Sequence, residues 1–448
     1  MSRPAFHFDL NRCTGCAACQ VACIIENQLP WDRSWRKVLD ANPEGAPAAP
    51  TYHLSMACNH CETAVCMKAC PALAYSRDHV TGALLIDADK CIGCSYCSWV
   101  CPYDAPSVNH DRGIMEKCTF CAPRLADGKE PACVSWCPTD ALGLTSTESG
   151  FTHQNVEGFK DAGLGPALEL IPLAQGRRRP EIELDPATAA LISEMSLPRI
   201  SATRGISLRK EWTLLLFTWL APLMVGLFSA VPSRQTDVPP LAFAGAGVLL
   251  MLLASLHLGN KARAWRVILG WRGSWLSREI ILWPAFLGAG FIYLQWQLPT
   301  AWAIPALLLG AGSLFSMDRL YTSIDAGRGP RLPSSSTLLT ALFYLGIFTG
   351  SMGLAKSVLA AKLLLYLAAK VRAALEGRSF RPGLSLTRIF LGFLTPALAF
   401  YSQSPAFAML LIPAILVAEF VDRMEFYFDL ELGSPKGQME RDNRAFQE

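Results

Sequence analysis

The chain has 448 residues, of which 51% are hydrophobic and 17% are charged. This length suits two or three domains, and the apolar content excludes a disordered protein and is too high for one ordinary soluble domain. The net charge of +3 gives no general electrostatic reason to expect binding to nucleic acid. All 16 cysteines lie within the first 137 residues, so the front third of the chain differs in kind from the rest.

Residues 1–11 contain neither the apolar run nor the twin-arginine pair of an export signal. We therefore expect the cysteine-rich segment to be made in the cytosol. In that reducing compartment, closely spaced cysteines bind metal more often than they form disulfides.

The cysteines form four groups of four. Their spacings are Cys13-x2-Cys16-x2-Cys19-x3-Cys23, Cys58-x2-Cys61-x4-Cys66-x3-Cys70, Cys91-x2-Cys94-x2-Cys97-x3-Cys101 and Cys118-x2-Cys121-x11-Cys133-x3-Cys137. The first and third groups have the spacing of bacterial-type 4Fe-4S ferredoxins, in which the fourth thiolate binds the other cluster of a pair. Four thiolates per cluster predict four 4Fe-4S clusters. Zinc held by four thiolates is the alternative, but the full runs of four cysteines favour iron.

Sharing of ligands between groups would tie the clusters into pairs. If the first group pairs with the fourth and the second with the third, the ligand sets are Cys13, Cys16, Cys19 and Cys137; Cys118, Cys121, Cys133 and Cys23; Cys58, Cys61, Cys66 and Cys101; and Cys91, Cys94, Cys97 and Cys70. The segment shows no histidine pair, carboxylate dyad or activated nucleophile of its own. It is therefore expected to conduct electrons.

Residues 146–210 lack both cysteines and long apolar runs, and are expected to link a domain at residues 1–145 to a membrane domain at residues 211–428. The charged run Arg177-Arg178-Arg179 in this linker is interpreted as solvated. One short amphipathic helix is expected near residues 186–195.

Apolar stretches in the membrane domain are long enough to cross a bilayer, which takes about 17–25 residues. We expect them at residues 212–231, 240–259, 279–297, 301–318, 336–355, 357–375, 385–401 and 405–425, with a tail at residues 429–448. The sixth is the weakest because it contains Lys362, so eight spans are expected and seven remain the alternative. The predicted fold is an α+β multi-4Fe-4S ferredoxin-like domain followed by an all-α polytopic membrane domain.

Lysine and arginine gather in one set of the predicted loops. This set contains Arg199, Arg204, Arg209, Lys210, Lys261, Arg263, Arg266, Arg272, Arg278, Arg319, Arg328, Arg331, Lys370, Arg372, Arg378 and Arg381. The opposite loops contain Arg234 and Lys356. Because positively charged loops stay in the cytoplasm, we expect a multi-pass protein of the bacterial inner membrane with its cysteine-rich domain and both termini in the cytoplasm.

The membrane domain contains a single histidine, His257, so haem held between two histidines is excluded by count. A lipid-soluble quinol is then the natural electron carrier, and it needs a proton-accepting group near the clusters. His257 lies two residues from the cytoplasmic end of the second stretch. An ionisable residue there is a functional candidate, and the alternative is a histidine hydrogen-bonded to a neighbouring helix.

The opening Phe8-Asp9-Leu10-Asn11-Arg12-Cys13-Thr14-Gly15-Cys16 and the order of the four cysteine groups resemble the electron-transfer subunit of the dimethyl sulfoxide reductase family over residues 4–145. These subunits are four-cluster partners of molybdopterin oxidoreductases. The resemblance implies a separate molybdopterin-containing catalytic subunit. Every ligand position is filled by cysteine, so nothing in this sequence implies a three-iron cluster.

The membrane domain is similar to the anchor subunit of the same family over residues 210–428. The similarity rests on Ser255-Leu256-His257-Leu258-Gly259 with Arg263-Ala264, Leu276-Ser277-Arg278-Glu279-Ile280, Arg319-x-Tyr321-x2-Ile324, Arg388 and Glu419-x3-Arg423-x2-Phe426-Tyr427. It implies a quinol site at His257, with further candidates in Arg263, Arg319, Tyr321, Arg388, Glu419 and Arg423. For Glu419, Arg423 and Arg319, an intramembrane salt bridge or interfacial anchoring is the alternative.

The chain is therefore expected to be a fusion of two subunits. It would relay electrons between membrane quinone, either menaquinone or ubiquinone, and a catalytic subunit that carries out S-oxide or N-oxide reduction or cytoplasmic sulfite oxidation. A membrane-anchored ferredoxin-type relay or redox sensor without a molybdenum partner is an alternative. A proton-translocating module ranks lower, because it predicts a continuous file of membrane carboxylates and Glu419 is the main acidic residue in the predicted spans.

Overall fold

The computed structural model describes residues 2–43, 50–175, 204–233, 237–324, 333–375, 381–402 and 405–447. The chain divides into two compact units. The cysteine unit comprises Met1–Arg204 and Leu432–Glu448, and the helical unit comprises Gly205–Glu431. The helix expected at residues 186–195 lies outside the described residues, as do the run Arg177-Arg178-Arg179 and the loop residues Arg199, Arg234, Arg328, Arg331 and Arg378.

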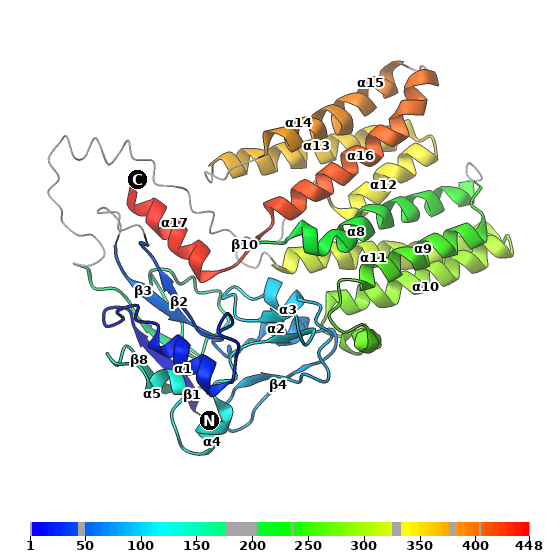
Figure 1. Ribbon diagram of the computed structural model, residues 1–448. Helices are drawn as coiled ribbons and strands as arrows, with labels where there is room; N and C mark the ends of the chain where they lie inside the picture. Colours follow the sequence, from blue (N-terminus) through cyan, green and yellow to red (C-terminus); the bar gives the residue numbers. More distant parts are fainter. Residues whose placement is uncertain are drawn as a thin grey trace, which may run out of the picture. The chain divides into compact units, whose positions relative to one another are not determined.

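A three-stranded sheet joins distant parts of the cysteine unit. β1 (Arg3–Asp9) lies at its centre, antiparallel to β8 (Leu142–Thr147) and parallel to β9 (Leu168–Ile171) (Figure 1). Phe6 and Phe8 alternate along β1 on its buried face, as the two-residue period of a strand requires. Because Phe8 faces Leu142, the chain just before Cys13 lies beside the chain just after Cys137.

Three hairpins and five short helices make up most of the remaining cysteine unit. The hairpins are β2 (Lys37–Asp40) with β3 (His53–Met56), β4 (Tyr75–Arg77) with β5 (Leu84–Ile86), and β6 (Ser107–Asn109) with β7 (Ile114–Glu116). The helices are α1 (Ala18–Glu26), α2 (Val65–Ala69), α3 (Tyr96–Trp99), α4 (Ala122–Ala126) and α5 (Ala132–Ser135). α1 packs against α5 and α2 packs against α3, so the helices pair as the four cysteine groups are predicted to pair.

The C-terminal helix α17 (Pro435–Gln447) is part of the cysteine unit. Met439 is buried in the core cluster that contains Phe6 and Phe8, and the Asp442 carboxylate accepts a hydrogen bond of 2.7 Å from the backbone N–H of Gly158. The cysteine unit thus extends past residue 145 through β9 and takes in the segment expected as a tail. The four-residue β9 and the polar α17 carry no strong pattern in the sequence.

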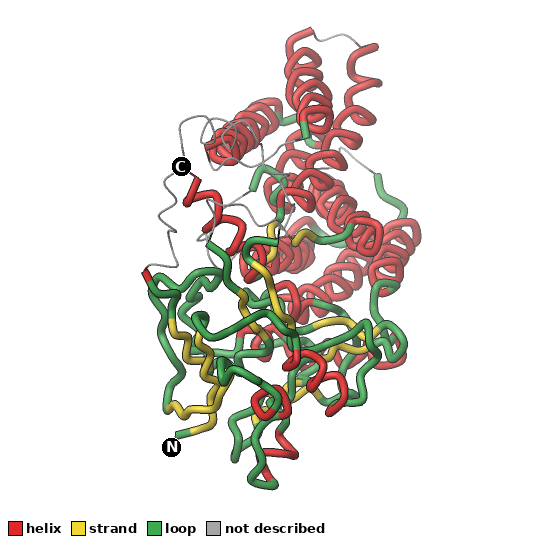
Figure 2. The backbone as a smooth tube through the Cα atoms, turned by 60° about the vertical axis from the view of Figure 1, so that its left-hand side comes forward, coloured by secondary structure: helices red, strands yellow, loops and turns green. Residues whose placement is uncertain are grey.

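The helical unit consists largely of helices that run alongside one another (Figures 1 and 2). They are α8 (Leu208–Ala230), α9 (Pro240–Ser255), α10 (Trp275–Gln295), α11 (Ala303–Ile324), α12 (Thr337–Phe348), α13 (Met352–Leu375), α14 (Pro382–Ile389), α15 (Thr395–Ser402) and α16 (Pro405–Asp429). A π-helical turn at Phe390–Leu394 joins α14 to α15. The two short strands β10 (Arg204–Gly205) and β11 (Glu431–Leu432) pair at the two ends of this unit.

Three helical segments among the described residues are long and apolar enough to cross a membrane. They are Leu208–Ser233, Thr300–Ile324 and Pro382–Phe400. The helices Pro240–Ser255 and Thr337–Phe348 are apolar but shorter. At a rise of 1.5 Å per residue they fall short of a hydrocarbon core about 30 Å thick. The helical unit is therefore a membrane domain with three clear spans.

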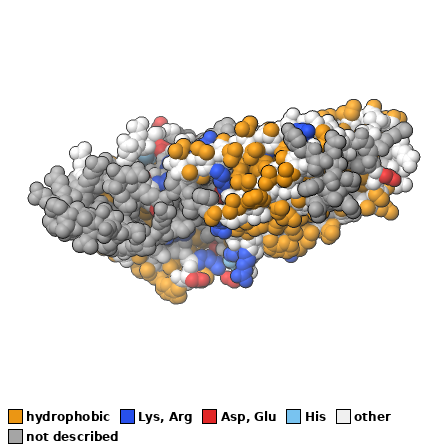
Figure 3. Space-filling view, turned by 90° about the horizontal axis from the view of Figure 1, so that it is seen from above, with side chains coloured by type: hydrophobic (Ala, Val, Ile, Leu, Met, Phe, Trp, Pro, Cys, Tyr) orange, Lys and Arg blue, Asp and Glu red, His pale blue; other side chains and the backbone are white. Residues whose placement is uncertain are grey.

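The outside of the helical unit is apolar and its inside is partly charged. Leu308 and Leu364 are each 68% exposed, whereas Lys362 and Arg388 are fully buried. Figure 3 shows hydrophobic side chains over much of the face that it presents of this unit. Lipid can cover such a surface, and charges inside a membrane domain are expected to face the protein interior.

Candidate functional site

Two of the cysteine groups lie in loops of the same backbone shape. In the first group, Gly15 (φ +71) and Ala17 (φ 59) adopt left-handed backbone on either side of Cys16. In the third group, Gly93 and Ser95 repeat this pattern. α1 and α3 follow these loops directly. The left-handed residues bend the chain tightly, as three closely spaced thiols require if they are to reach one cluster.

The first and fourth cysteine groups come together where α1 packs on α5. Cys137 lies within electrostatic range of Cys13 and Cys19. Cys133 lies within the same range of Cys23 and Cys121. The structure thus brings the first and fourth groups into one region, where Cys19 lies within electrostatic range of both Cys133 and Cys137.

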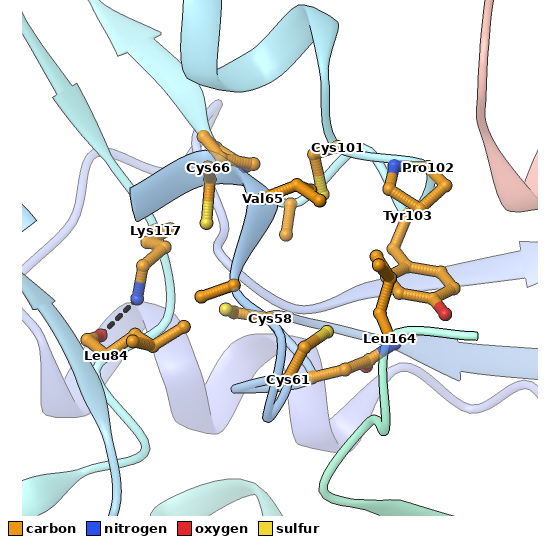
Figure 4. A pocket seen from close by; sticks show the side chains of 14 residues that line it. Cys58, Cys61, Val65, Cys66, Leu84, Cys101, Pro102, Tyr103, Lys117 and Leu164 are labelled. Atoms are coloured by element: carbon orange, nitrogen blue, oxygen red, sulfur yellow. Dashed lines mark hydrogen bonds between the residues drawn. The ribbon is translucent and has the colours of Figure 1, made fainter. Parts of the chain in front are cut away.

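A cavity between the second and third groups is lined by sulfur. Cys58, Cys61 and Cys66 of the second group and Cys101 of the third face a common space (Figure 4). This is the predicted set, and a space walled by four thiols fits a 4Fe-4S cluster, in which each iron takes one thiolate. Within the described residues, no three side chains of His, Cys, Asp or Glu are arranged to hold a single metal ion.

The last predicted set, Cys70, Cys91, Cys94 and Cys97, is gathered in the same way. Cys70 and Cys91 lie within electrostatic range of Cys94, as does Cys97. Backbone N–H groups also point at the sulfurs: Ala74 donates to Cys70 Sγ over 3.3 Å. Such hydrogen bonds stabilise thiolates and help to set the potential of a bound cluster.

Burial makes several of these thiols weaker acids than a free cysteine. It raises the pKa of Cys101 and Cys121 to about 11 and that of Cys94 to about 12. Cys137 differs: burial alone would raise its pKa, but hydrogen bonds from the backbone of Leu142 and Thr139 lower it below the ordinary value. Because a metal binds the thiolate form, loading of the buried sets must displace protons.

Two buried cations lie among the cysteines. Arg36 is 2% exposed, donates from Nη1 to the carbonyl oxygen of Ser55 over 3.2 Å, and lies within electrostatic range of Cys19 and Cys133. Lys117 lines the cavity of Figure 4. Among the described residues neither cation pairs with a carboxylate. A buried charge without a counter-ion costs several kcal/mol, so an anionic cluster held by these cysteines would supply the missing negative charge.

The Cys13 set lies nearest the protein surface. Cys16 is exposed, and Cys13, Cys19 and Cys137 are partly exposed, whereas Cys91, Cys94, Cys97 and Cys70 are all buried. Exposed apolar side chains occur close by in the sequence at Ile25 and Trp136. This set is therefore the one most accessible to an electron-transfer partner.

The quinone-site candidates of the helical unit lie in three places. His257 lies in the turn after α9, where its Nδ1 meets the carbonyl oxygen of Ala254. With Nδ1 so engaged, Nε2 is the nitrogen that can meet a quinol hydroxyl. Arg263 follows in the 3-10 helix Lys261–Gly270. These two residues, which are neighbours in the sequence, are the first place.

The second place lies between α11 and α16. The Arg423 guanidinium stacks 4.8 Å from the ring centroid of Tyr321 and donates to Thr218 Oγ1 over 2.9 Å. The Tyr321 hydroxyl forms a short hydrogen bond with the hydroxyl of Tyr427. Arg319, though it is on the same helix as Tyr321, lies over the Trp275 ring at 5.5 Å.

The third place contains Arg388 and Glu419, which form an ion pair of 3.2 Å. For this pair the structure shows the intramembrane salt bridge that was the alternative interpretation. Lys362 forms an ion pair with Glu419, and Asp422 forms one with Arg388. Neither Lys362 nor Asp422 was predicted as a site residue. Asp422 lies three residues after Glu419, so both side chains lie on the same face of a helix. This spacing in the sequence could have led to the prediction of Asp422 as a site residue. Buried Glu279, within electrostatic range of Arg423, was also not selected.

Comparison with known proteins gives a consistent result for both units. Residues 50–147 match the family described as 4Fe-4S dicluster domain, and residues 207–375 match the DMSO reductase anchor subunit (DmsC). The thiosulfate reductase electron transfer subunit PhsB of Salmonella typhi is 45% identical over 137 residues, which are 30% of this chain and 71% of that protein. The chain belongs to the dimethyl sulfoxide reductase family of electron-transfer subunits.

Two further relatives extend this family assignment. One polypeptide of the anaerobic dimethyl sulfoxide reductase of Escherichia coli K12 is 40% identical over 145 residues, 31% of this chain and 70% of that protein. One polypeptide of the sulfite dehydrogenase of Allochromatium vinosum is 32% identical over 218 residues, 42% of this chain and 88% of that protein. These matches together with the anchor match confirm the expected fusion of an iron-sulfur subunit with a membrane-anchor subunit.

Proposed function

We propose that this chain relays electrons through four 4Fe-4S clusters between membrane quinone and a separate molybdopterin-containing catalytic subunit. The observation that supports the proposal is the cavity lined by Cys58, Cys61, Cys66 and Cys101, which is one of the ligand sets predicted from spacing, together with the closeness of the first and fourth cysteine groups. Bound clusters would supply one-electron transfer. The cysteine thiolates would hold them, backbone N–H groups such as that of Ala74 would donate to the sulfurs, and Arg36 and Lys117 would balance their negative charge.

The Cys13 set is proposed as the end of the relay that faces the catalytic subunit, because it is the most exposed of the four. The partner itself is inferred from the relatives, whose names describe subunits of thiosulfate reductase, dimethyl sulfoxide reductase and sulfite dehydrogenase. These names keep reduction of a sulfur compound, such as thiosulfate or an S-oxide, and oxidation of sulfite in view, and the family resemblance adds reduction of an N-oxide.

The helical unit is proposed to bind quinone at His257, whose Nε2 would accept the quinol proton, with Arg263 beside it in sequence. Tyr321 with Arg423, and Arg319, are further candidate contacts. Both ends of the helical unit continue into the same cysteine unit, which supports an even number of membrane spans. This supports eight spans over seven. The distribution of Lys and Arg supports a cytoplasmic cysteine unit in the inner membrane.

Purification of the intact complex from membranes tests this function. About sixteen irons per chain, as four cubane clusters require, a co-purifying molybdopterin subunit and quinol-dependent reduction of the clusters are expected. His257→Gln should abolish the reaction with quinol and leave the iron content unchanged. Full iron with no catalytic subunit and no reaction with quinol would instead favour the redox relay or sensor.

A further inference from the structure

Two arginines from different helices of the helical unit share one tryptophan ring. The Arg278 guanidinium lies 4.2 Å from the ring centroid of Trp275, and the Arg319 guanidinium lies 5.5 Å from it. Arg278 belongs to the first turn of α10, whereas Arg319 lies near the end of α11, which packs against α10 (Figure 1). The two cations therefore lie at the same end of this helix pair.

Both guanidinium groups have N–H donors that the protein does not use. Arg278 donates from Nε to the carbonyl oxygen of Trp271 over 3.0 Å and from Nη2 to that of Arg272 over 2.8 Å, and these bonds fix its position. Its Nη1 meets no acceptor among the described residues. The Arg319 side chain meets neither an acceptor nor a carboxylate within that part of the chain, and only the ring of Trp275 holds it.

The carboxylates next to these arginines in the sequence are engaged elsewhere. Asp318 accepts a hydrogen bond of 2.8 Å from the backbone N–H of Thr337. Glu279 is buried and lies within electrostatic range of Arg423. An anion that pairs with the two arginines would therefore have to come from outside the described part of the chain.

An apolar strip on α11 leads to the arginines. It consists of Ile304, Leu308 and Phe315, which are each 48% to 68% exposed. With Arg319 these residues are spaced four, seven and four apart, so all of them lie on one face of the helix. From Ile304 to Arg319 the helix rises by about 22 Å, which is more than half of a bilayer core roughly 30 Å thick. The strip is thus long enough to contact a whole acyl chain of one leaflet.

The segment before α10 has the composition of a segment at a membrane surface. The 3-10 helix Lys261–Gly270 and the turn after it combine positive charges with exposed apolar side chains. The rings of Trp265 and Trp271 are exposed, and Arg266 and Arg272 each lie 5.3 Å from the centroid of one of them. Tryptophan favours the interface between hydrocarbon and headgroups. We therefore expect this end of the helix pair to lie at the level of the lipid headgroups.

We propose that Trp275, Arg278 and Arg319 form a binding site for an anionic phospholipid. The lipid phosphate accepts hydrogen bonds from the unused donors of the two guanidinium groups, which suit phosphate oxygens in geometry and charge. One acyl chain lies along the strip on α11. Basic sites between membrane helices bind headgroups of this kind. Because cardiolipin carries two phosphates, it matches two guanidinium groups better than a lipid with one phosphate.

Anchoring at the interface does not by itself require two cations from different helices over one ring. The convergence of Arg278 and Arg319 is what distinguishes a site from a general belt of interfacial residues. For Arg319 the proposal assigns the interfacial role that was the alternative to a quinone contact. The site goes beyond the proposed electron relay and does not depend on it.

The test measures lipid binding by the whole chain as purified from membranes, so its outcome is independent of electron transfer. The chain is washed free of lipid in a neutral detergent and titrated with cardiolipin or phosphatidylcholine, and bound lipid is counted by native mass spectrometry. Each arginine beside an anionic headgroup contributes about fivefold in affinity. One cardiolipin should therefore bind about 25-fold more tightly than phosphatidylcholine. Arg278→Gln should weaken cardiolipin binding about fivefold and leave that of phosphatidylcholine unchanged.

Two further variants keep the result interpretable. Arg372→Gln removes an exposed cation from the last turn of α13, outside the site, and should keep the wild-type affinity. Arg319→Gln tests the same site if Arg278→Gln does not fold, as judged by circular dichroism and thermal stability.

Several outcomes would overturn the lipid site. They are equal affinity for the two lipids, an unchanged affinity for cardiolipin in the folded arginine variants, and an equal loss in Arg372→Gln, which would show a response to net charge alone. Displacement of cardiolipin by millimolar inorganic phosphate would overturn the choice of a lipid and indicate a site for free phosphate.

Discussion

The two units both bury charge, but they balance it differently. In the cysteine unit, Arg36 and Lys117 are buried beside Cys19, Cys118 and Cys66, whose pKa values burial raises, so that these free thiols are neutral at neutral pH. In the helical unit, Lys362 and Arg388 are buried beside Glu419 and Asp422, which are carboxylates of the same chain. The first unit depends on a bound anionic group for its charge balance, whereas the second is balanced by its own residues.

This difference predicts where each unit is sensitive to change. A buried cation without a counter-ion destabilises a fold by several kcal/mol. The stability of the cysteine unit should therefore follow its metal content, while that of the helical unit should follow its ion pairs. Each of the following experiments changes one side of this comparison.

The largest effect is expected from removal of iron. A chelator applied to the intact chain in detergent should leave Arg36 and Lys117 without counter-ions, so the cysteine unit should lose its protease resistance while the helical unit keeps its helices. Limited proteolysis with mass spectrometry locates the cuts, and circular dichroism reports the helices. Equal loss of both units would show that their charge balance is not independent.

Next in size is the loss of one buried partner in the helical unit. Lys362→Met leaves Glu419 and Asp422 with Arg388 alone, and such a loss costs about 3–5 kcal/mol. The free energy of unfolding in detergent micelles measures it, and Lys356→Met at the exposed start of α13 is the matched control. Combining Lys362→Met with Glu419→Gln should cost less than the sum of the two single changes.

The contribution of α17 to the cysteine unit should be of similar or smaller size. Met439→Ala removes a fully buried side chain from the core cluster, which typically costs about 2–5 kcal/mol. Thermal melting of the cysteine unit within the whole chain should show the loss. Lys436→Ala, an exposed position on the same helix, should leave the melting temperature unchanged. An unchanged melting temperature in both variants would contradict the placement of α17 in the core.

The smallest effect is expected from Arg36→Gln. Because reduction adds negative charge beside this cation, its loss should favour the oxidised clusters about tenfold, which corresponds to a fall in potential of ~59 mV for one electron. Redox titration followed by electron paramagnetic resonance measures the shift. Lys37→Gln, one residue away and partly exposed, is the control. Arg36→Lys keeps the charge and should restore most of the potential.

The closeness of particular cysteine groups was predictable because ligand spacing is local chemistry. Two runs of the same spacing indicated shared ligands, and the packing of α1 on α5 and of α2 on α3 brings together the groups expected to share them. The buried network of the helical unit was not predictable, because Lys362 and Glu419 are 57 residues apart and no local pattern joins them. Lys362, which made the prediction of the sixth span weaker, forms an ion pair with Glu419 when the helices pack together.

Other features were missed because their patterns are weak. β9 has four residues, and its pairing with β1 depends on a strand more than 150 residues away. α17 is largely polar, and Met439 alone marks the face that enters the core. Such contacts are set by tertiary packing and not by local periodicity.

The position of α17 has a consequence for the order of biosynthesis. Domains of a growing chain generally fold as units, beginning at the N-terminus. Here the cysteine unit contains residues 435–447, which leave the ribosome after all the helices of the helical unit. The cysteine unit can therefore reach its final packing only after synthesis of the membrane helices is complete. Closure of the core would then be a late step, and a segment translated before the membrane helices would mature after them.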